Sequence, residues 1–164
     1  MIVSSGDNGY GTNYPAASPH VVAVGGTSLQ LNRGRVSSET TWAGAGSGCS
    51  LYEPKSAWQR DTRCSRRTIA DLAADADPQT GAAIYDSYGS NGRGWLTLCG
   101  TSLAAPLVSG LLASSGRAGI APSRLYASSI RDITDGANGN CRNYLCHGTT
   151  GYDGPAGIGV PNGW

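Results

Sequence analysis

Two short apolar segments constrain the fold of this chain more than any other feature. Residues 21–24 form an unbroken apolar run closed by two glycines, and residues 69–74 form a second segment that looks buried. An unbroken apolar run suits a strand covered on both faces, as strands of a parallel sheet are. The two segments therefore predict an α/β fold with a parallel sheet at its centre.

Length and charge narrow the class of protein. The chain has 164 residues, which is one domain by length, residues 1–164. Its net charge of +1 argues against nucleic acid as a partner, and it offers neither a polybasic membrane anchor nor an apolar stretch of about 18 residues. A content of 25 glycines with only 14% charged residues is typical of a secreted, turn-rich protein.

Cysteine spacing supports the same compartment. The pairs Cys49/Cys64 and Cys141/Cys146 lie in loop-like sequence and lack the second ligand pair that a zinc site needs. We expect two local disulfides, the alternative being reduced, partly buried thiols. Cys99 is left over and is expected to be a buried free thiol.

The other elements follow from local patterns. Small and apolar residues predict a helix over 102–115, with Thr101 as its N-cap and Gly116 as its C-cap. A shorter helix opens at Pro122 and covers 122–129. The remaining expectations are a strand at 2–5, an irregular polar segment at 33–68, strands at 82–85 and 95–99 joined by a turn at 89–92, and a loop-rich tail from 132.

The chemistry centres on Ser102, which begins the first of these helices directly after an apolar strand. The free N–H groups and dipole of a helix N-terminus favour developing negative charge, which suits a nucleophilic serine. A serine there is also a common helix cap, and spacing alone leaves both interpretations open.

The segment Gly100-Thr101-Ser102-Leu103-Ala104-Ala105-Pro106 resembles the serine motif shared by subtilisins and sedolisins. Further segments agree with sedolisins in chain order: 5–9, 14–19, 22–27, 47–50, 58–59, 71–81, 132–134 and 151–159. The resemblance implies a partial subtilisin-like parallel sheet flanked by helices, followed by a loop-rich C-terminal calcium-binding region. It also implies a secreted, acid-active serine-type endopeptidase acting on proteins or peptides.

The resemblance assigns roles to two residues. Ser102 would be the nucleophile, and Asp7 would stand in the oxyanion-hole turn, where subtilisins carry an asparagine. A charged carboxylate would repel an oxyanion, so Asp7 helps only when protonated. Protonation requires an acidic medium or an apolar setting that disfavours the charged form.

The tail resembles the sedolisin calcium region. By that resemblance the carboxylates of Asp132 and Asp153 and the carbonyls of Ile133, Thr149 and Gly151 would bind Ca²⁺, which prefers oxygen ligands. Without the resemblance, the same tail is simply a glycine-rich loop with exposed aspartates.

The general base of the family, a Glu oriented by an Asp one helical turn away, has no counterpart in this sequence. Its two glutamates, Glu39 and Glu53, lack such an Asp and lie downstream of Asp7. We therefore expect the chain to be the C-terminal part of a peptidase domain, inactive without its N-terminal half.

Other functions stay open. The chain could be a non-catalytic calcium-binding scaffold or an unstable remnant of a gene. An esterase of the α/β-hydrolase type would use Ser102, Asp132 and His147 in that order, but its Gly-x-Ser-x-Gly elbow is broken by Ala104.

Overall fold

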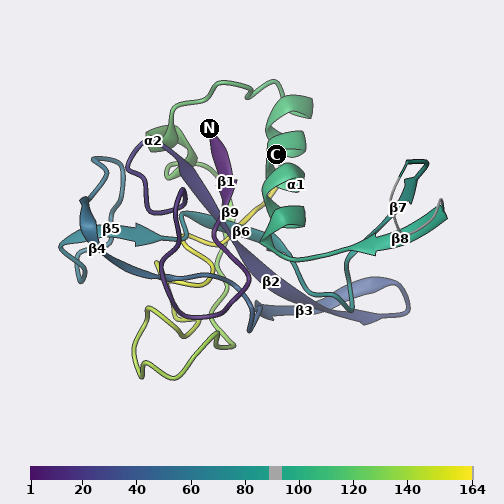
Figure 1. Ribbon diagram of the computed structural model, residues 1–164, viewed down its shortest axis with the longest axis horizontal. Coiled ribbons are helices and arrows are strands. Elements are labelled where there is room, and N and C mark those ends of the chain that lie inside the picture. Colours follow the sequence, from purple (N-terminus) through teal and green to yellow (C-terminus); the bar gives the residue numbers. More distant parts are fainter. Residues whose placement is uncertain (89–93, 164) are drawn as a thin grey trace.

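The structure, a computed structural model, describes residues 1–88 and 94–163 (Figure 1). Its strands are β1 (Ile2–Ser4), β2 (Val22–Asn32), β3 (Arg35–Thr41), β4 (Gly48–Pro54), β5 (Arg66–Ile69), β6 (Leu72–Asp75), β7 (Ala82–Asp86), β8 (Gly94–Leu98), β9 (Ile130–Arg131) and β10 (Val160–Pro161). Its helices are α1 (Thr101–Ser114) and α2 (Pro122–Leu125).

Strand β2 organises the central sheet. It pairs in parallel with β1 on one side and with β6 on the other, in registers that include Val3↔Ala23 and Gly25↔Ala73. This confirms the parallel pairing expected around the apolar run. The sheet also has an antiparallel part, because the chain turns back after β2 and β3 pairs with it antiparallel. Arg33 and Gly34 form the turn, both with positive φ.

The two glycines after the apolar run do not end the strand, contrary to expectation. Gly25 and Gly26 lie inside β2, where other chain segments press on the backbone. A Cβ on Gly25 would lie 2.0 Å from the carbonyl oxygen of Pro155, and one on Gly26 would lie 2.7 Å from the Cβ of Ala76. Glycine stands here because there is no room for a side chain.

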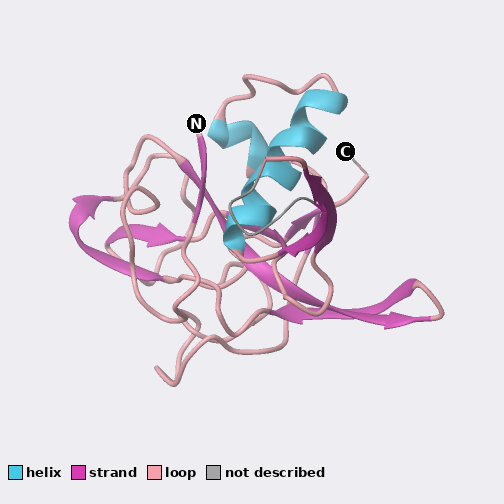
Figure 2. Ribbon diagram, turned by 45° about the vertical axis from the view of Figure 1, so that its right-hand side comes forward, coloured by secondary structure: helices cyan, strands magenta, loops and turns pink. Residues whose placement is uncertain are grey.

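Helix α1 packs across β1, β2 and β6 and closes one face of the sheet (Figures 1 and 2). Val24 of β2, Leu72 of β6 and Val108 of α1 meet in the main hydrophobic core with 0% exposure. The opposite face is covered by loops and the tail, through a cluster that contains Ala73, Ile133 and Val160. A sheet covered on both faces is what the apolar runs predicted.

Several predicted boundaries are wrong. Helix α1 begins one residue earlier than expected, so that Gly100 is its N-cap and Ser115 its C-cap. Helix α2 ends at Leu125 instead of 129. The segment 33–68 contains β3, β4 and the start of β5. The first four residues of β3 are exposed, and neither β3 nor β4 has the regular apolar alternation that reveals a half-buried strand.

The cysteine pairing is confirmed. Disulfides join Cys49 to Cys64 and Cys141 to Cys146, and Cys99 is a free, half-buried thiol. The tail is loop-rich as expected, apart from the short β9–β10 ladder. The expected turn at 89–92 lies outside the described residues. Within the described ranges, no helix is long and apolar enough to cross a membrane.

Candidate active site and calcium loop

Ser102 lies in the first turn of α1 and its side chain is exposed. Strand β8 leads into this turn through Gly100, whose amide donates to the carbonyl oxygen of Ala76 beside β6 at 2.7 Å. Among residues 1–88 and 94–163, the structure records no hydrogen-bond partner for the Ser102 hydroxyl. The predicted placement of a free hydroxyl at a helix N-terminus is therefore met by the geometry.

Asp7 is docked onto the same helix end. Its Oδ1 accepts hydrogen bonds from both the backbone N–H and the hydroxyl of Thr101, each at 2.7 Å. The carboxylate thus serves the helix in place of a cap side chain, because the N-cap Gly100 has none. Sequence reasoning assigned the cap to Thr101, whereas Thr101 is a fully buried residue that clamps Asp7.

Gly100 is required by this contact. Its φ of +80° lies in the left-handed region. A Cβ at this position would also lie 2.5 Å from Oδ2 of Asp7. Any side chain at Gly100 would displace the carboxylate, so the glycine and Asp7 form one unit.

The turn that carries Asp7 is held from several sides. The Gly6 amide donates to the Thr101 hydroxyl at 3.0 Å, and the Gly46 amide donates to the Gly6 carbonyl at 2.7 Å. The Ser5 amide donates to the carbonyl oxygen of Val24, which ties the turn to β2. The position of Asp7 is therefore set by the sheet and by α1 together.

The two oxygens of Asp7 have different surroundings. Oδ1 accepts both donors from Thr101, whereas Oδ2 lies over Gly100. A proton on this carboxyl group would therefore sit on Oδ2, where it can be donated. Asp7 is exposed in the described structure.

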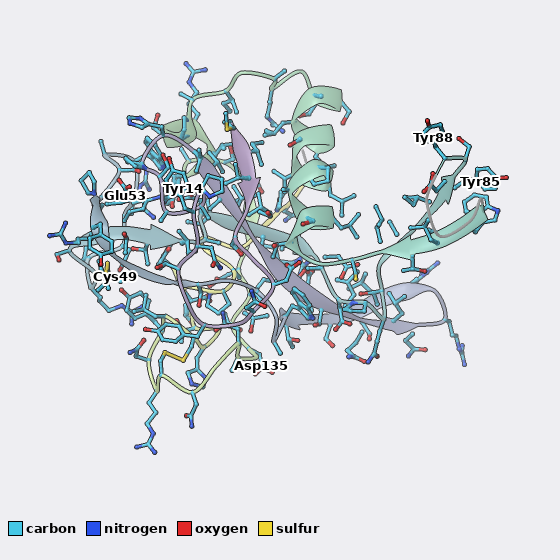
Figure 3. All side chains as sticks on the ribbon, in the orientation of Figure 1. Tyr14, Cys49, Glu53, Tyr85, Tyr88 and Asp135 are labelled. Atoms are coloured by element: carbon cyan, nitrogen blue, oxygen red, sulfur yellow. A yellow bond between two sulfur atoms is a disulfide. The ribbon has the colours of Figure 1, made fainter. Side chains whose placement is uncertain are left out.

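The two glutamates lie on β3 and β4. Glu39 accepts a hydrogen bond from the Thr27 hydroxyl and pairs with Arg131. Glu53 lines a cavity of about 210 Å³ together with Asn13, Tyr14 and other residues of the 12–17 and 50–53 loops. Figure 3 shows Tyr14 and Glu53 near each other at one end of the molecule. Neither glutamate is placed as a base for Ser102.

The esterase arrangement gains no support. The Asp132 carboxylate accepts from the Gly151 amide, and His147 is a half-buried residue bridged to Ala137. Both contacts belong to the tail and neither involves Ser102.

The structure does bring the predicted calcium ligands into one loop system. Oδ2 of Asp132 accepts from the Gly151 amide at 2.8 Å, and Oδ2 of Asp153 accepts from the Thr149 amide at 3.0 Å. Ile133 is buried between these segments and the sheet. In the described part of the chain, no group of three or more His, Cys, Asp or Glu side chains is arranged to hold a metal ion. A site here would depend on two carboxylates and backbone carbonyls.

Asp153 shows the electrostatic character of this loop. It is fully buried, and burial raises its pKa to about 7, although the amides of Thr149 and Ala156 oppose the shift. The nearby Asp132 carboxylate raises it further. The Thr149 hydroxyl is also buried without a hydrogen-bond partner in the described structure. Carboxylate and hydroxyl oxygens of this kind are the ligand type that a hard cation prefers.

A second buried carboxylate was not recognised from the sequence as part of a network. Asp71 receives two hydrogen bonds of 2.6 Å from the Arg67 guanidinium, and both side chains have 0% exposure. Burial lowers the pKa of Arg67, but its hydrogen bonds and charge pairing with Asp71 outweigh this and leave the pKa raised. The spacing of four residues between opposite charges was the available signal, hidden in an arginine-rich segment.

The fold places the chain in a known protein family. The subtilase family model matches residues 1–148, and the chain belongs to that family. Within it, the resemblance to sedolisins is confirmed. The chain is 34% identical to sedolisin of Pseudomonas sp. (strain 101) over 99% of its own length and 32% of that protein. It is 32% identical to xanthomonalisin of Xanthomonas sp. (strain T-22), over 92% of this chain and 21% of that protein.

A solved structure agrees. Pseudomonas sedolisin, a serine-carboxyl proteinase complexed with two molecules of pseudo-iodotyrostatin, matches with a TM-score of 0.79 and 32% identity. The match covers 98% of this chain and 52% of that chain. The chain therefore spans about a third or less of the length of these curated relatives and about half of the solved domain.

Proposed function

We propose that this chain supplies the nucleophile and one oxyanion donor of a serine-type endopeptidase that acts on proteins or peptides at acidic pH. The observation that carries the proposal is the docking of Asp7 on Thr101, one residue before an exposed serine at a helix N-terminus. A cap alone would not need a carboxylate brought from a residue so distant in the sequence.

In this mechanism the Ser102 hydroxyl attacks the scissile carbonyl carbon and gives its proton to a base. Negative charge then collects on the carbonyl oxygen. Protonated Asp7 donates a hydrogen bond to this oxygen from Oδ2, and the backbone N–H of Ser102 donates a second. The acid requirement follows, because ionised Asp7 would repel the oxyanion.

The base is proposed to be a carboxylate that lies outside these 164 residues, since Glu39 binds Thr27 and Arg131 and Glu53 lines the cavity between the 12–17 and 50–53 loops. We therefore expect the isolated chain to have negligible activity. Robust cleavage of denatured protein at about pH 4 that Ser102→Ala abolishes would contradict this expectation.

Covalent labelling tests the assignment of the nucleophile. The complete gene product is treated with a phosphonate reagent at acidic pH, and the labelled residue is identified by mass spectrometry. Label is expected on Ser102, lost in Ser102→Ala and kept in the control Ser109→Ala, which lies on the same helix with its hydroxyl bonded to the Ala105 carbonyl. Equal labelling of the Ser102→Ala variant would remove the assignment.

Kinetics test Asp7. Removing one oxyanion donor typically costs about a hundredfold or more in kcat, so Asp7→Ala should lose at least that. Asp7→Asn keeps Oδ1 for Thr101 and places an amide donor over Gly100. It should therefore retain more activity than Asp7→Ala and lose the requirement for acid. A near-normal rate for Asp7→Ala would overturn the role.

A second proposed function is calcium binding by the tail, favoured by the paired carboxylates and the orphaned Thr149 hydroxyl. The carboxylates of Asp132 and Asp153 and the carbonyls of Ile133, Thr149 and Gly151 would hold the ion, which would neutralise the two charges and stabilise the loops. If Ser102 never labels but calcium binds, the non-catalytic scaffold is the better description. Two disulfides support a secreted protein in either case.

A further inference from the structure

Residues 44–47, here called the 44–47 loop, lie between β3 and β4 and support the turn that carries Asp7. Three backbone hydrogen bonds join the loop to this turn: the Gly46 amide to the Gly6 carbonyl at 2.7 Å, the Gly9 amide to the Gly44 carbonyl at 2.9 Å, and the Gly11 amide to the Ser47 carbonyl at 2.8 Å. The contact is close, because a Cβ on Gly46 would lie 2.2 Å from the carbonyl oxygen of Ser5. A shift of the loop would therefore move the turn.

The side chain of Asn138, which belongs to the tail, holds the 44–47 loop. Asn138 is 5% exposed, and its Nδ2 donates hydrogen bonds to the Ala45 carbonyl oxygen and, at 2.7 Å, to the Ser47 hydroxyl. Since a carbonyl oxygen only accepts, the amide nitrogen must face the loop. The Ser47 hydroxyl in turn donates to the carbonyl oxygen of Leu145 at 2.5 Å. Without the Asn138 side chain, the buried Ala45 carbonyl would lose this donor, which is costly.

The backbone of Asn138 contacts the turn directly. Its carbonyl oxygen accepts a hydrogen bond from the Tyr10 amide at 2.9 Å. The contact leaves no room at Gly9, where a Cβ would lie 2.7 Å from the same oxygen. The Asn138 amide donates to the Cys146 carbonyl at 3.0 Å, next to one of the disulfides. Asn138 therefore anchors the turn both directly and through the 44–47 loop.

These contacts complement the hydrogen bonds from Thr101. Thr101 binds Oδ1 of Asp7 from the start of α1, whereas Asn138 and the 44–47 loop hold the backbone of the turn. The position of Oδ2, from which the hydrogen bond to the oxyanion is proposed to be donated, depends on both anchors. Such a donor must be placed accurately, because a displacement of about 1 Å can cost about a hundredfold in rate.

We propose that Asn138 is a positioning residue of the oxyanion hole. It fixes the 44–47 loop and the turn that carries Asp7, and so keeps the Asp7 carboxyl group where it stabilises the transition state. The proposal rests on the peptidase function proposed above. It adds a residue of the tail that acts through Asp7 and not on the substrate.

Kinetics of the complete gene product test this role. Asn138→Leu keeps a side chain of similar size but removes the Nδ2 donor. It should lower kcat at least about tenfold and leave KM within about threefold, because the lost interaction matters chiefly in the transition state. The matched control is Asn140→Leu, an exposed asparagine two residues further on, which should leave both constants within about twofold.

A double-mutant cycle separates positioning from a general loss of structure. In the Asp7→Ala background, Asn138→Leu should lower kcat by less than about twofold, because no carboxyl group remains to be positioned. Ser47→Ala is the milder variant, which removes only the hydroxyl that Asn138 and Leu145 bind, and it should show the same non-additivity if Asn138→Leu does not fold.

The outcomes distinguish this role from the function on which it rests. A protein that cleaves and needs Asp7, but whose kcat is unchanged in the Asn138 and Ser47 variants or falls equally with and without Asp7, overturns the positioning role alone. A near-normal rate for Asp7→Ala overturns the roles of Asp7 and Asn138 together. An unmutated protein that neither cleaves polypeptide nor labels at Ser102 overturns the peptidase function, and the positioning role with it.

Discussion

Two buried carboxylates of this protein have opposite electrostatic surroundings. Asp71 faces the guanidinium of Arg67 and also accepts from the Ala23 amide and the Tyr126 hydroxyl, at 2.8 and 2.7 Å. Asp153, equally buried, accepts only backbone amides, from Thr149 and Ala156. Its nearest charged influences are the Asp132 carboxylate, which repels it, and Arg63.

The difference is that Asp71 is paired with a buried cationic side chain, whereas Asp153 lies near another carboxylate. Around Asp71 the chain itself supplies the compensating charge, and the pair joins the loop before β6 to β2 and to the segment after α2. Around Asp153 burial and the Asp132 carboxylate raise the pKa to about 7, although Arg63 and the amides of Thr149 and Ala156 oppose the shift. A buried carboxyl group without a counter-charge is stabilised either by a proton or by a bound cation.

The largest effect on the free energy of unfolding is expected from breaking the pair between Arg67 and Asp71. Arg67→Met removes the guanidinium and leaves Asp71 as an uncompensated buried charge, so the free energy of unfolding should fall by about 3–5 kcal/mol. Urea unfolding measures this. Arg66→Met, at an exposed neighbour whose guanidinium binds the Tyr52 carbonyl, is the control and should change little. Similar losses in both variants would show that the pair is not special.

Calcium should offset the loss of stability that ionisation of Asp153 causes. The folded pKa of Asp153, about 7, lies above its ordinary value of 3.8. The stability contributed by the neutral acid is therefore fully present below about pH 4 and is lost as pH rises through 7. Without calcium, the melting temperature should fall across this range. At a hundredfold excess over Kd, Ca²⁺ should restore about 2.7 kcal/mol at neutral pH and less at pH 4.

Asp153→Asn should abolish both the pH dependence and the calcium response, whereas Asp135→Asn, an exposed acid in the same tail, should preserve them. A folded, metal-free preparation whose melting temperature ignores calcium at neutral pH would remove the site.

Asp7 extends the comparison to an exposed carboxylate. Thr101→Val keeps the shape of the side chain but removes the hydroxyl that binds both Asp7 and the Gly6 amide. We expect a loss of about 2 kcal/mol in the free energy of unfolding, because the buried contacts lose their partner, and Thr101→Ser should recover most of it. If the Thr101→Val and Thr101→Ser variants have the same free energy of unfolding, the Thr101 hydroxyl does not stabilise the turn that carries Asp7.

The smallest effect is expected at the outer ion pair between Arg131 and Glu39. The Arg131 side chain is 48% exposed and is screened by solvent, whereas the Glu39 side chain is 5% exposed and keeps the Thr27 hydroxyl as a donor when Arg131 is removed. Arg131→Met should lower the free energy of unfolding by about 1 kcal/mol or less, as measured beside Arg67→Met under identical conditions. A loss as large as that of Arg67→Met would erase the distinction between buried and exposed pairs.

The sequence predictions are right where residues close together in the sequence decide the structure. The apolar runs identified two central strands, the small-residue helix was placed to within a residue at each end, and both cysteine pairs were identified. Strands β3 and β4 were not predicted, because neither has a regular alternation of apolar and polar residues. The two glycines of β2 were wrongly predicted to end the strand. Glycine is needed there because Pro155 and Ala76, which are remote in the sequence, lie too close for a side chain.

By itself the sequence determined the class of the fold and the two disulfides, since residue type and local spacing indicate these. Only the tertiary structure decided that Thr101 binds Asp7, that Arg67 pairs with Asp71 and that Asp153 is buried near Asp132. Each of these outcomes depends on which distant segments meet and on how much water remains between them, because desolvation and hydrogen bonding set the energy of a charge.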